Sequence, residues 1–411
     1  MRARMRLLLP PTLVAAGGCL LLAWLGLKTA AFTDYETEVE PAAQALRDGH
    51  LRAFLDALPS YGGSLALRAP FAFLPKLWGG GYMALFRSMS APCLMAGAML
   101  GVALWARALR LDRGRAAAWA ALCLCAINPL TLRALEIGHP EELLGAVLVV
   151  AAALTAGSGR PLAAGVLLGL AVANKPWAVL AVVPVALVAP GRRGLLLGAA
   201  AASAAALLGP LLLAGSPVVD QAGNVARNTG VIFQPWQIWW FLGDHGQVVM
   251  GGFGPKPGYR AAPDWIGHVA RPVMVLVPVA LSLALAPRLR ARPWQDGLLL
   301  LAFVLLLRCL LDPWNVVYYE LPFLLALVAW EIHARQGVPA ISLVATLLCW
   351  VTLEQLTHQA SPDVQAAAFL AWSVPLALVM GVRLFAPARL QLPLLPQLLE
   401  VGLEGQRGRR A

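Results

Sequence analysis

Long apolar segments separated by short polar turns run along almost the whole chain. A helix needs about 20 apolar residues to cross the hydrocarbon core of a bilayer, and a window of that length finds about twelve candidates. The pattern therefore predicts an all-α polytopic membrane protein with about 12 transmembrane helices, within a range of roughly 10 to 13 because several segments are short. We expect a single membrane domain over residues 1–411. The approximate limits of the segments are 7–32, 83–106, 116–130, 141–157, 161–173, 176–190, 194–214, 272–287, 297–311, 320–334, 338–353 and 364–384.

The composition agrees with this class and excludes an ordinary soluble protein. Hydrophobic residues make up 59% of the chain, charged residues make up 13%, and the mean hydropathy is +0.70. The net charge of +11 comes from short basic clusters between apolar segments, which orient helices, so no nucleic-acid partner is expected. The positive-inside rule then predicts that both termini lie in the cytoplasm, including a basic tail at 385–411. The other cytoplasmic clusters are at residues 107–115, 160, 192–193, 288–292 and 335.

Two long polar segments are expected on the extracytoplasmic side. In the first, residues 33–82, apolar residues recur at helical spacing before Gly49, which predicts an amphipathic interfacial helix along the membrane surface. The second, residues 215–271, is rich in glycine, proline and tryptophan, which is typical of an irregular lid with aromatic anchors at the interface. Since most unusual polar groups fall on this side, we expect the chemistry there. The apolar positions of the predicted helix are Val39, Ala42, Ala43 and Leu46.

Two cations occupy positions that are unusual in so apolar a chain. Lys175 lies in N-K-P-W between two short apolar segments, at the outer tip of a predicted helical hairpin. It either binds a lipid phosphate or extends to lipid headgroups, as lysines near membranes often do. Arg308 lies inside the apolar sequence L-L-L-R-C-L-L-D, four residues before Asp312. It either forms an intrahelical ion pair with Asp312 or acts as a phosphate clamp that Asp312 orients.

Three segments together give the chain a resemblance to a known class of enzymes. They are the acidic T-D-Y-E-T-E directly after the first apolar segment, G-x-x-x-G-L-A-V-A-N-K-P-W at 165–177, and D-P-W-N-V-V-Y-Y-E-L-P-F at 312–323. With these segments the chain resembles the bacterial polyprenyl-phosphate-sugar-dependent glycosyltransferases of the GT-C superfamily, and it looks most like the integral membrane mannosyltransferases. The resemblance implies a GT-C-like fold embedded in the lipids of a bacterial plasma membrane and a role in cell-envelope biosynthesis.

The resemblance also implies a reaction. The expected donor is a polyprenyl-phosphate-linked sugar, with mannose as the first candidate, and the expected acceptor is a hydroxyl of a glycolipid or glycan, with inversion at the anomeric carbon. In that family an Asp or Glu of the first outer loop is the catalytic base, which matches Asp34 here, with Glu36 as the next choice. Such a base suits the reaction because an alcohol is a weak nucleophile until a carboxylate begins to take its proton. The alternative is a charged edge that stops the first helix at the interface.

Six further residues are candidates for contacts with the acceptor or the sugar. The histidine and glutamate among them precede a predicted helix, where they would also suit ordinary helix-start chemistry or a second base. The two tyrosines form either an aromatic belt at the interface or a platform for a sugar ring. The remaining two lie in the long loop, where they either contact substrate or are simply solvated. The six are His139, Glu141, Tyr318, Tyr319, His245 and Arg260.

The sequence lacks the signatures of several other chemistries. No run has metal-ligand spacing, so we expect no obligatory metal or other cofactor, while a divalent cation bound by carboxylates and histidines stays open. A P-loop and the G-x-S-x-G and H-E-x-x-H motifs are missing from the sequence, which argues against a nucleotide-sugar-using domain. The competing function is a multi-pass transporter or flippase of a lipid or polar solute. Such proteins tend to have repeated halves and polar breaks near the bilayer midplane, whereas the breaks here cluster at the outer ends.

Overall fold

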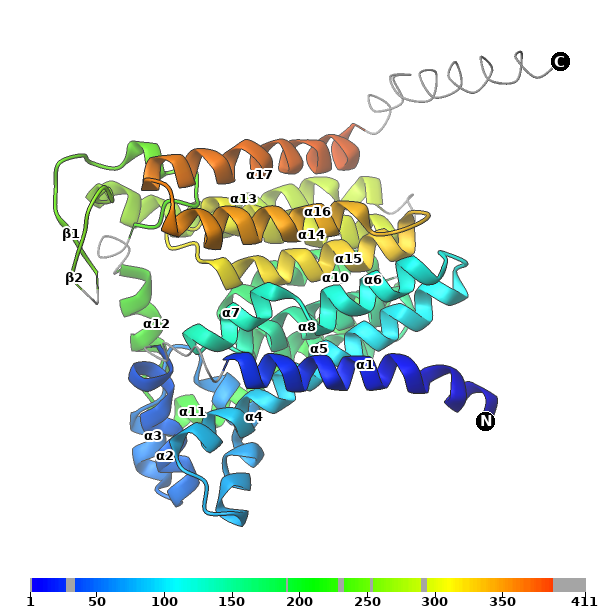
Figure 1. Ribbon diagram of the computed structural model, residues 1–411, viewed down its shortest axis with the longest axis horizontal. Coiled ribbons are helices and arrows are strands. Elements are labelled where there is room, and N and C mark those ends of the chain that lie inside the picture. The colour runs from blue at the N-terminus through cyan, green and yellow to red at the C-terminus, as the bar shows by residue number, and fades with distance from the viewer. Residues whose placement is uncertain are drawn as a thin grey trace.

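Long helices that run roughly parallel form a bundle, and shorter helices and loops gather at one of its ends (Figure 1). The structure is a computed structural model that describes residues 2–26, 34–189, 191–227, 233–251, 254–289 and 294–386. In these ranges the only strands are β1 and β2, a short antiparallel pair in which Val249 lies opposite Lys256. The elements, with η for 3-10 or π turns, are α1 (Arg2–Gly26), η1 (Tyr35–Val39), α2 (Glu40–Asp48), α3 (Leu51–Asp56), α4 (Gly62–Ala72), η2 (Leu74–Leu77), α5 (Tyr82–Arg110), α6 (Arg115–Ala126), α7 (Pro129–Ile137), α8 (Glu141–Gly157), α9 (Pro161–Asn174), η3 (Pro176–Ala181), α10 (Val182–Val188), α11 (Arg193–Leu213), α12 (Val218–Arg227), η5 (Trp240–Leu242), β1 (Val249–Gly251), β2 (Gly254–Lys256), α13 (Asp264–Leu289), α14 (Gln295–Leu311), η6 (Val317–Glu320), α15 (Leu321–Ala334), α16 (Ala340–Trp350), η7 (Val351–Gln355), η8 (Leu356–His358) and α17 (Pro362–Phe385).

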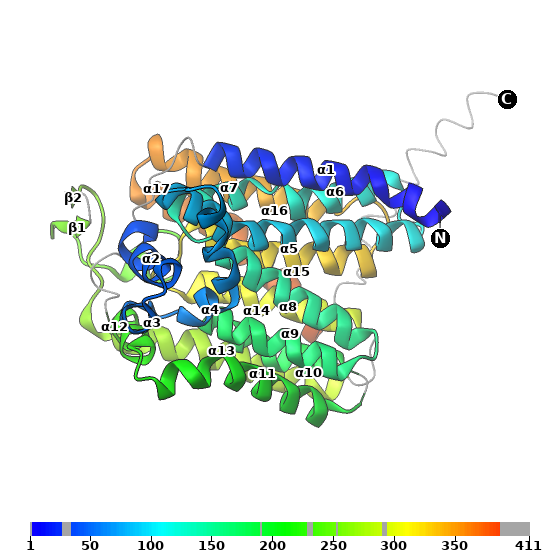
Figure 2. The same cartoon turned by 90° about the horizontal axis from the view of Figure 1, so that it is seen from below.

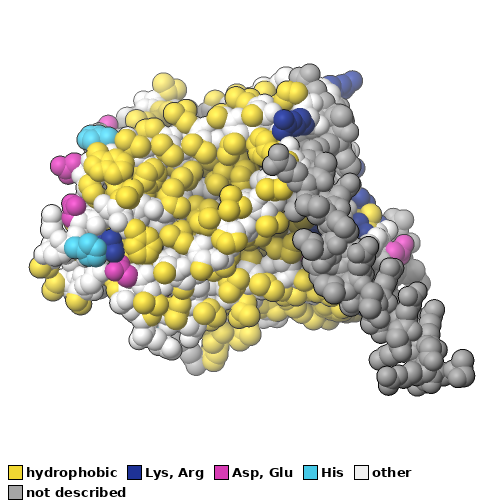
Figure 3. Space-filling model, turned by 90° about the horizontal axis from the view of Figure 1, so that it is seen from above, with side chains coloured by type: hydrophobic (Ala, Val, Ile, Leu, Met, Phe, Trp, Pro, Cys, Tyr) yellow, Lys and Arg dark blue, Asp and Glu magenta, His cyan; other side chains and the backbone are white. Residues whose placement is uncertain are grey.

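Six helices in the described part of the chain are long and apolar enough to cross a membrane, which agrees with the all-α membrane class. They are Met83–Arg110, Arg115–Ile137, Arg193–Leu213, Asp264–Arg288, Ala340–His358 and Pro362–Phe385. Shorter apolar helices accompany them at Leu9–Leu25, Pro161–Asn174 and Pro176–Val188. One face of the bundle is broadly apolar, and acidic and histidine side chains gather at one end of that face (Figure 3). The larger number of about 12 crossings stays a prediction.

The two ends of the bundle carry different side chains. Arg113, in the turn between α5 and α6, donates hydrogen bonds of 3.0 Å to the carbonyls of Ile332 and His333 near the end of α15. Arg107 donates to the ring of His333 at 3.3 Å. These contacts bring basic turns that are distant in sequence together at one end, hereafter the arginine end. The opposite end, hereafter the site end, carries the turn at 138–140, the turn at Lys175 and both long polar segments (Figure 1).

Three helices, α8, α14 and α15, occupy the centre of the bundle. Nearly every residue of α14 and α15 is buried, because both sequences are apolar on all sides and need a neighbour on every face. The important departures from this apolar composition are buried charged groups at the site end. Glu141 and Glu142 begin α8, and Arg308 lies in the last turn of α14. The buried core thus delivers charges of both signs to one place.

Two glycines hold α9 against α11. A Cβ atom at Gly165 would lie 2.2 Å from the carbonyl oxygen of Leu196, and one at Gly169 would lie 2.2 Å from that of Ala200. Any larger residue would push the helices apart, which is the usual reason for small residues at membrane helix contacts. This contact fixes the site end of α9, where the chain becomes extended at Lys175.

The first polar segment is mostly helical and projects from the side of the bundle (Figures 1 and 2). The helix expected there is α2, and it ends at Gly49, whose φ of 84° lies in the left-handed region that glycine favours. Val39, Ala42 and Ala43 of its apolar stripe are buried against α4 and α5 rather than left for lipid. The stripe therefore fastens the segment to the bundle directly after Asp34. Whether the segment also touches the membrane surface stays a prediction.

The second polar segment is shorter than the predicted 215–271. Helix α13 begins at Asp264, so the residues up to Arg271 are helical, with Pro272 inside the helix. The apolar window misses this start because Asp264, His268 and Arg271 interrupt the first two turns of α13. Within the segment, α12 and the β1–β2 hairpin add regular structure. The basic tail was expected at 385–411, and its residues from 387 onward lie outside the described part of the chain.

Two tryptophans of this segment, expected as interfacial anchors, are buried instead. The indole N–H of Trp236 donates to the carbonyl of Thr352 at 3.1 Å, and that of Trp240 donates to Asp363 at 2.8 Å. Buried indoles need such partners because an unpaired N–H is costly away from water. They attach the segment to η7, which follows α16, and to the site end of α17.

Candidate active site

A cavity of about 550 Å³ opens at the site end. It lies where the residues after α1, the α7–α8 turn, the start of η3 and the site ends of α13 and α14 meet. Six of the residues predicted from the sequence line it, namely Asp34, Lys175, Arg308, His139, Tyr318 and Tyr319. Because these residues come from five separate parts of the chain, the fold has brought a carboxylate, cations and aromatic rings into one space.

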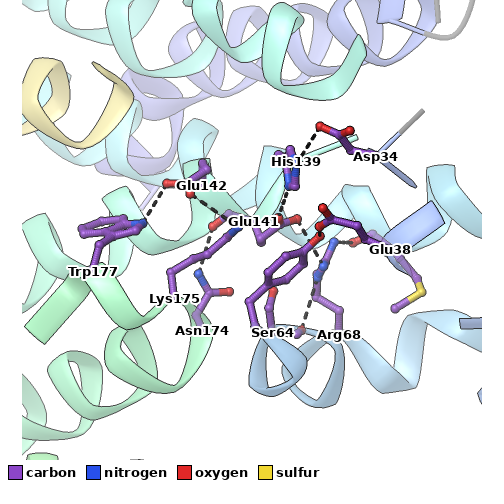
Figure 4. Close-up of polar contacts among 12 residues, drawn as sticks. Asp34, Glu38, Ser64, Arg68, His139, Glu141, Glu142, Asn174, Lys175 and Trp177 are labelled. Atoms are coloured by element: carbon purple, nitrogen blue, oxygen red, sulfur yellow. Dashed lines mark hydrogen bonds and ion pairs between the residues drawn. The ribbon is translucent and has the colours of Figure 1, made fainter. Parts of the chain in front are cut away.

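Asp34 is held by a chain of hydrogen bonds (Figure 4). Nε2 of His139 lies 3.2 Å from Oδ2 of Asp34, and Nδ1 of the same ring lies 2.8 Å from Oε1 of Glu141. The Asp34 side chain nevertheless keeps 39% of its surface exposed. A carboxylate that is oriented by one hydrogen bond and still open to the cavity has the geometry of a general base.

Gly138 makes this contact possible. Helix α7 ends at Ile137, and Gly138 follows with a φ of 101°, in the left-handed region that favours glycine. A Cβ atom here would lie 2.6 Å from the backbone nitrogen of Tyr35, the residue after Asp34. A side chain at this position would therefore move the turn, and His139 with it, away from Asp34.

His139 is positively charged at neutral pH. Burial by itself would lower its pKa, but the carboxylate of Glu141 and the hydrogen bond to Asp34 outweigh burial and raise the pKa from 6.5 to about 9. The imidazolium then donates from both ring nitrogens. Since the folded-state pKa lies above the unfolded value, the stabilisation is fully present below about pH 6.5 and is lost as the pH rises through about 9.

Glu141 is fully buried behind the cavity and gathers three cations. Besides His139, Nζ of Lys175 lies 3.0 Å from Oε1, and Nη2 of Arg68 lies 3.4 Å from Oε2. The amide of Asn174 donates to its backbone carbonyl at 2.9 Å. Removing a buried carboxylate with so many partners would leave buried charges uncompensated, which is strongly destabilising. Glu141, predicted as an acceptor contact, is thus placed to organise the cations and does not line the cavity.

Lys175 lies at the tip of the α9–η3 hairpin and points into the cavity. Its ammonium is 3.4 Å from Oε1 of Glu142 and 3.7 Å from the ring centre of Tyr61. Burial by itself would lower the pKa of Lys175, but Glu141 and Glu142 outweigh burial and raise it, so the side chain stays charged. Only 7% of the residue is exposed, so this lysine does not extend to lipid headgroups.

Arg308 leaves several of its donors without a close partner among the described residues. Its Nη1 donates to the carbonyl of Tyr319 at 3.3 Å, its Nη2 lies 4.0 Å from Glu142, and its Nε has no hydrogen-bond partner among the described residues. The guanidinium lies over the rings of Tyr319 and Trp177, at 4.1 and 4.9 Å. A guanidinium has five N–H donors in a fork that matches phosphate oxygens. Because Nε is buried, Nη2 is the group of Arg308 best placed to meet an anionic group in the cavity.

Asp312 pairs with a different arginine from the one expected. Its carboxylate lies 3.1 Å and 3.2 Å from Nη1 of Arg271, and it accepts a hydrogen bond of 3.0 Å from the backbone N–H of Trp314. Helix α14 ends at Leu311 and Asp312 is extended, so the i to i+4 geometry of an intrahelical pair with Arg308 does not form. Arg271 becomes a second guanidinium in the cavity wall.

The comparisons with known proteins agree with this geometry. The model of glycosyltransferase family 87 matches residues 63–313, which is more than half of the chain and includes Lys175, Arg271 and Arg308. The chain belongs to glycosyltransferase family 87. This is a family of GT-C-type membrane glycosyltransferases, so the predicted superfamily is confirmed and the protein is an integral membrane glycosyltransferase. No curated protein and no solved structure matches the chain.

For this family 87 enzyme, the charge on His139 predicts a pH dependence. We expect the transfer rate to fall on the alkaline side with an apparent pKa near 9, because the neutral ring can no longer donate to both carboxylates. His139→Gln keeps one donor but does not titrate, so its profile should lack this fall. The measurement is transfer at saturating donor over roughly pH 6 to 10. An alkaline fall that persists unchanged in His139→Gln would assign it to another group.

The tyrosines face the cavity of the family 87 enzyme rather than a membrane belt. The ring of Tyr318 lies 4.8 Å from the ring of His139, and Tyr319 lies beneath Arg308. Tyr61, which the sequence analysis did not single out, donates from its hydroxyl to Glu38 at 2.6 Å and packs edge-on to His139. These rings form apolar walls beside charged groups, which suits the faces and hydroxyls of a sugar.

Three predicted residues lie away from the cavity. Glu36 and His245 are exposed, on η1 and on the long loop. Arg260 binds both carboxylate oxygens of Asp363, at 3.0 and 3.1 Å, beside the indole of Trp240. A bidentate pair of this kind fixes geometry, so Arg260 is placed to fasten the long loop onto α17.

Sequence reasoning missed several residues that the family 87 fold brings to the site. Arg68 is buried and stands alone in an apolar stretch, which is the same signal that singled out Arg308. Glu142 follows Glu141 and was assigned no separate role. Glu38 lines the cavity, whereas its neighbour Glu36 does not. The spacing of two residues along η1 turns these carboxylates in different directions, which the sequence alone does not specify.

Proposed function

We propose that this enzyme moves a sugar, with mannose as the first candidate, from a polyprenyl-phosphate donor to an acceptor hydroxyl, with inversion at the anomeric carbon. The observation that carries the proposal is that one cavity holds an open, oriented carboxylate, Asp34, together with the cations Lys175, Arg271 and Arg308. Family membership supports glycosyl transfer in general. The charge pattern supports a phosphate-bearing donor, because cations suit the negative charge that develops on a departing phosphate.

The reaction requires one bond to form and one to break. The acceptor oxygen attacks the anomeric carbon while its proton passes to the Asp34 carboxylate. The bond from the anomeric carbon to the phosphate oxygen breaks, and its electron pair leaves with the polyprenyl phosphate. Attack from the face opposite the leaving group inverts the carbon. Arg308, with donors still available, is proposed to hold the phosphate, and Lys175 supplies a second positive charge.

The cavity also has an apolar wall suited to the chain of such a donor. Val179 and Leu180 of η3 and Met274 and Val275 of α13 line it on the side of the cations. Val179 is 46% exposed on the surface of the bundle. A phosphate held by Arg308 would therefore leave its polyprenyl chain to pass between η3 and α13 toward lipid.

The orientation in the membrane follows from the charges. The arginine end collects the basic turns, and the positive-inside rule assigns such turns to the cytoplasm. We infer that the site end is extracytoplasmic and that the membrane is a bacterial plasma membrane. A donor assembled in the cytoplasm would then have to be presented at the outer face before transfer.

The function is tested by transfer in proteoliposomes. Purified full-length protein, radiolabelled polyprenyl-phosphate mannose and lipids or glycans from its native host should give labelled product, and the anomeric configuration of the product should be opposite to that of the donor. We expect EDTA to leave the rate unchanged, because among the described residues no cluster of His, Cys, Asp and Glu could hold a metal ion. Movement of label across the bilayer without a new glycosidic bond would favour the transporter or flippase and contradict the proposal.

A further inference from the structure

One wall of the catalytic cavity is formed by the segment that connects α14 to α15, hereafter the aromatic wall. Most side chains of this segment line the cavity, but Asn315 is fully buried and does not line it. The same holds for Glu320, at the end of η6. These two residues therefore support the aromatic wall from behind. The side chains of the wall that line the cavity are Asp312, Trp314, Val316, Tyr318 and Tyr319.

The amide of Asn315 uses both of its hydrogens. Nδ2 donates to the carbonyl of Trp236 at 2.8 Å and to Oε1 of Glu320 at 3.1 Å. A reversed amide would place its oxygen against the Trp236 carbonyl, so this contact fixes the orientation of the amide. It also joins the aromatic wall to the second polar segment. That segment reaches the cavity at Gln234, whose backbone N–H donates to the carbonyl of Pro313 at 3.1 Å.

Glu320 has no charged partner. It forms no ion pair with any described residue, although Arg308 and Cys309 of α14 and Cys349 of α16 face it. Arg308 donates instead to the carbonyl of Tyr319 at 3.3 Å. The Cys309 thiol lies within hydrogen-bond reach of both Glu320 and that carbonyl, but a thiol is a weak, neutral donor. Because an isolated buried carboxylate is far more costly than the neutral acid, this environment favours a protonated Glu320.

Two oxygens of these side chains are left over. Oδ1 of Asn315 and Oε2 of Glu320 are buried and have no hydrogen-bond partner among the described residues. If Glu320 is ionised, both atoms are acceptors and both stay unpaired, which is costly away from water. A carboxylic acid and a carboxamide can instead form a planar pair with two hydrogen bonds. A proton on Oε2 would be donated to Oδ1, and both atoms would then be satisfied.

We propose that Glu320 is kept as the neutral carboxylic acid and that its two-way pair with Asn315 positions the aromatic wall against the second polar segment. In this acid–amide pair Oε2–H donates to Oδ1, and Nδ2–H donates to Oε1. Both residues are positioning residues, since neither lines the cavity. Their effect on substrate is exerted through the rings of Trp314, Tyr318 and Tyr319. The inference deepens the proposed function, on which its activity measurement rests.

The activity experiment compares a variant that keeps the pair with variants that break it. Glu320→Gln keeps both hydrogen bonds, because its amide donates to Oδ1 and accepts from Nδ2, so we expect kcat and KM for labelled polyprenyl-phosphate mannose within about threefold of wild type. Glu320→Leu should raise the KM for the donor by about tenfold, the size expected for one lost hydrogen bond, and change kcat less. Asn315→Leu should do the same, and the double variant should lose no more than either single variant.

Infrared difference spectroscopy of the purified protein in lipid tests the proton directly. The wild-type minus Glu320→Gln spectrum at neutral pH should contain the C=O stretching band of a protonated carboxylic acid. Glu331→Gln is the matched control, since Glu331 is also buried on α15. Its Oε2 accepts from the backbone N–H and the hydroxyl of Ser342, both at 2.7 Å, which suits an ionised carboxylate. The acid band should be absent from its difference spectrum, and its KM for the donor should stay unchanged.

Three results would overturn the inference. One is a loss of activity in Glu320→Gln as large as that in Glu320→Leu, because Glu320 would then act through its charge. Another is a wild-type minus Glu320→Gln spectrum without the acid band, and the third is an unchanged donor KM in folded Glu320→Leu. If Glu320→Leu does not fold, Glu320→Gln and the spectrum decide. Failure of the wild-type enzyme to transfer label would instead refute the proposed function, while the infrared measurement would still test the acid–amide pair.

Discussion

Asp34→Asn is expected to lower the rate of sugar transfer by about 10² to 10⁴ while the protein stays folded. Asparagine keeps the size of the side chain, but it cannot accept the proton of the acceptor hydroxyl. Its amide oxygen can still accept from His139, whose Nε2 lies 3.2 Å from Oδ2 of Asp34 in the wild-type protein. The loss should therefore appear in kcat, with little change in the KM for the donor, whose proposed phosphate contacts lie elsewhere in the cavity. The measurement is steady-state transfer from labelled donor, with a melting curve of each variant.

Glu36→Gln is the matched control for this prediction. It removes the same kind of charge from the same acidic cluster, two residues away, at an exposed side chain that does not line the cavity. We expect its rate to stay within about threefold of wild type, since exposed substitutions usually have small effects. If both variants were equally impaired, the cluster would act through its total charge. If Asp34→Asn kept full activity, Asp34 would not be the base, and Glu38 would become the carboxylate to test.

Arg308→Gln is expected to lower kcat/KM for the lipid-phosphate donor by about 10² to 10³, the usual cost of removing one preorganised donor to developing charge. The reason is that its Nε and part of its Nη donors have no partner among the described residues. Arg308→Lys should recover only part of the loss, because an ammonium keeps the charge but not the planar fork. The measurement is kcat and KM for the donor, combined with binding of the polyprenyl phosphate product.

Folding must be separated from catalysis in the Arg308 variants, because the residue is 3% exposed and lies 4.0 Å from Glu142. Glu142 keeps Lys175 at 3.4 Å and the indole of Trp177 at 2.8 Å, so it would not be left as an unpaired charge. Arg335→Gln removes an arginine at the arginine end, 3.9 Å from Glu331, and should leave transfer unchanged. If Arg308→Gln bound the polyprenyl phosphate product with wild-type affinity, Arg308 would not be the residue that holds the donor phosphate.

The cavity contains two groups of charged residues that have different roles in the proposed reaction. On one side His139 connects Asp34 to Glu141, and on the other Lys175 and Arg308 meet at Glu142. Because Glu141 also binds Lys175, a change of charge on the base side is felt on the phosphate side. In the proposed reaction, proton transfer to Asp34 and departure of the phosphate would thereby be linked through buried, paired groups.

The sequence alone determined the class of protein and singled out its main candidate residues. Hydrophobic runs of membrane length predicted the long helices because burial in lipid depends on local composition, and no partner segment is needed to recognise it. Asp34, Lys175 and Arg308 were recognisable for a similar reason, since a charge next to or inside an apolar segment is costly and calls for a role. Their position relative to one another was only a hypothesis at that stage.

Tertiary structure decided which charges meet. Arg68 and Glu141 are 73 residues apart, and His139 and Asp34 are 105 residues apart, so no local pattern encodes either contact. The partner of Asp312 changed from the neighbouring Arg308 to Arg271 because α14 ends one residue too early for an intrahelical pair. Periodicity in the sequence shows which face of a helix is apolar. Ion pairs in a low-dielectric interior depend instead on distances of a few ångströms between side chains of different helices. Only the packing of the helices sets those distances.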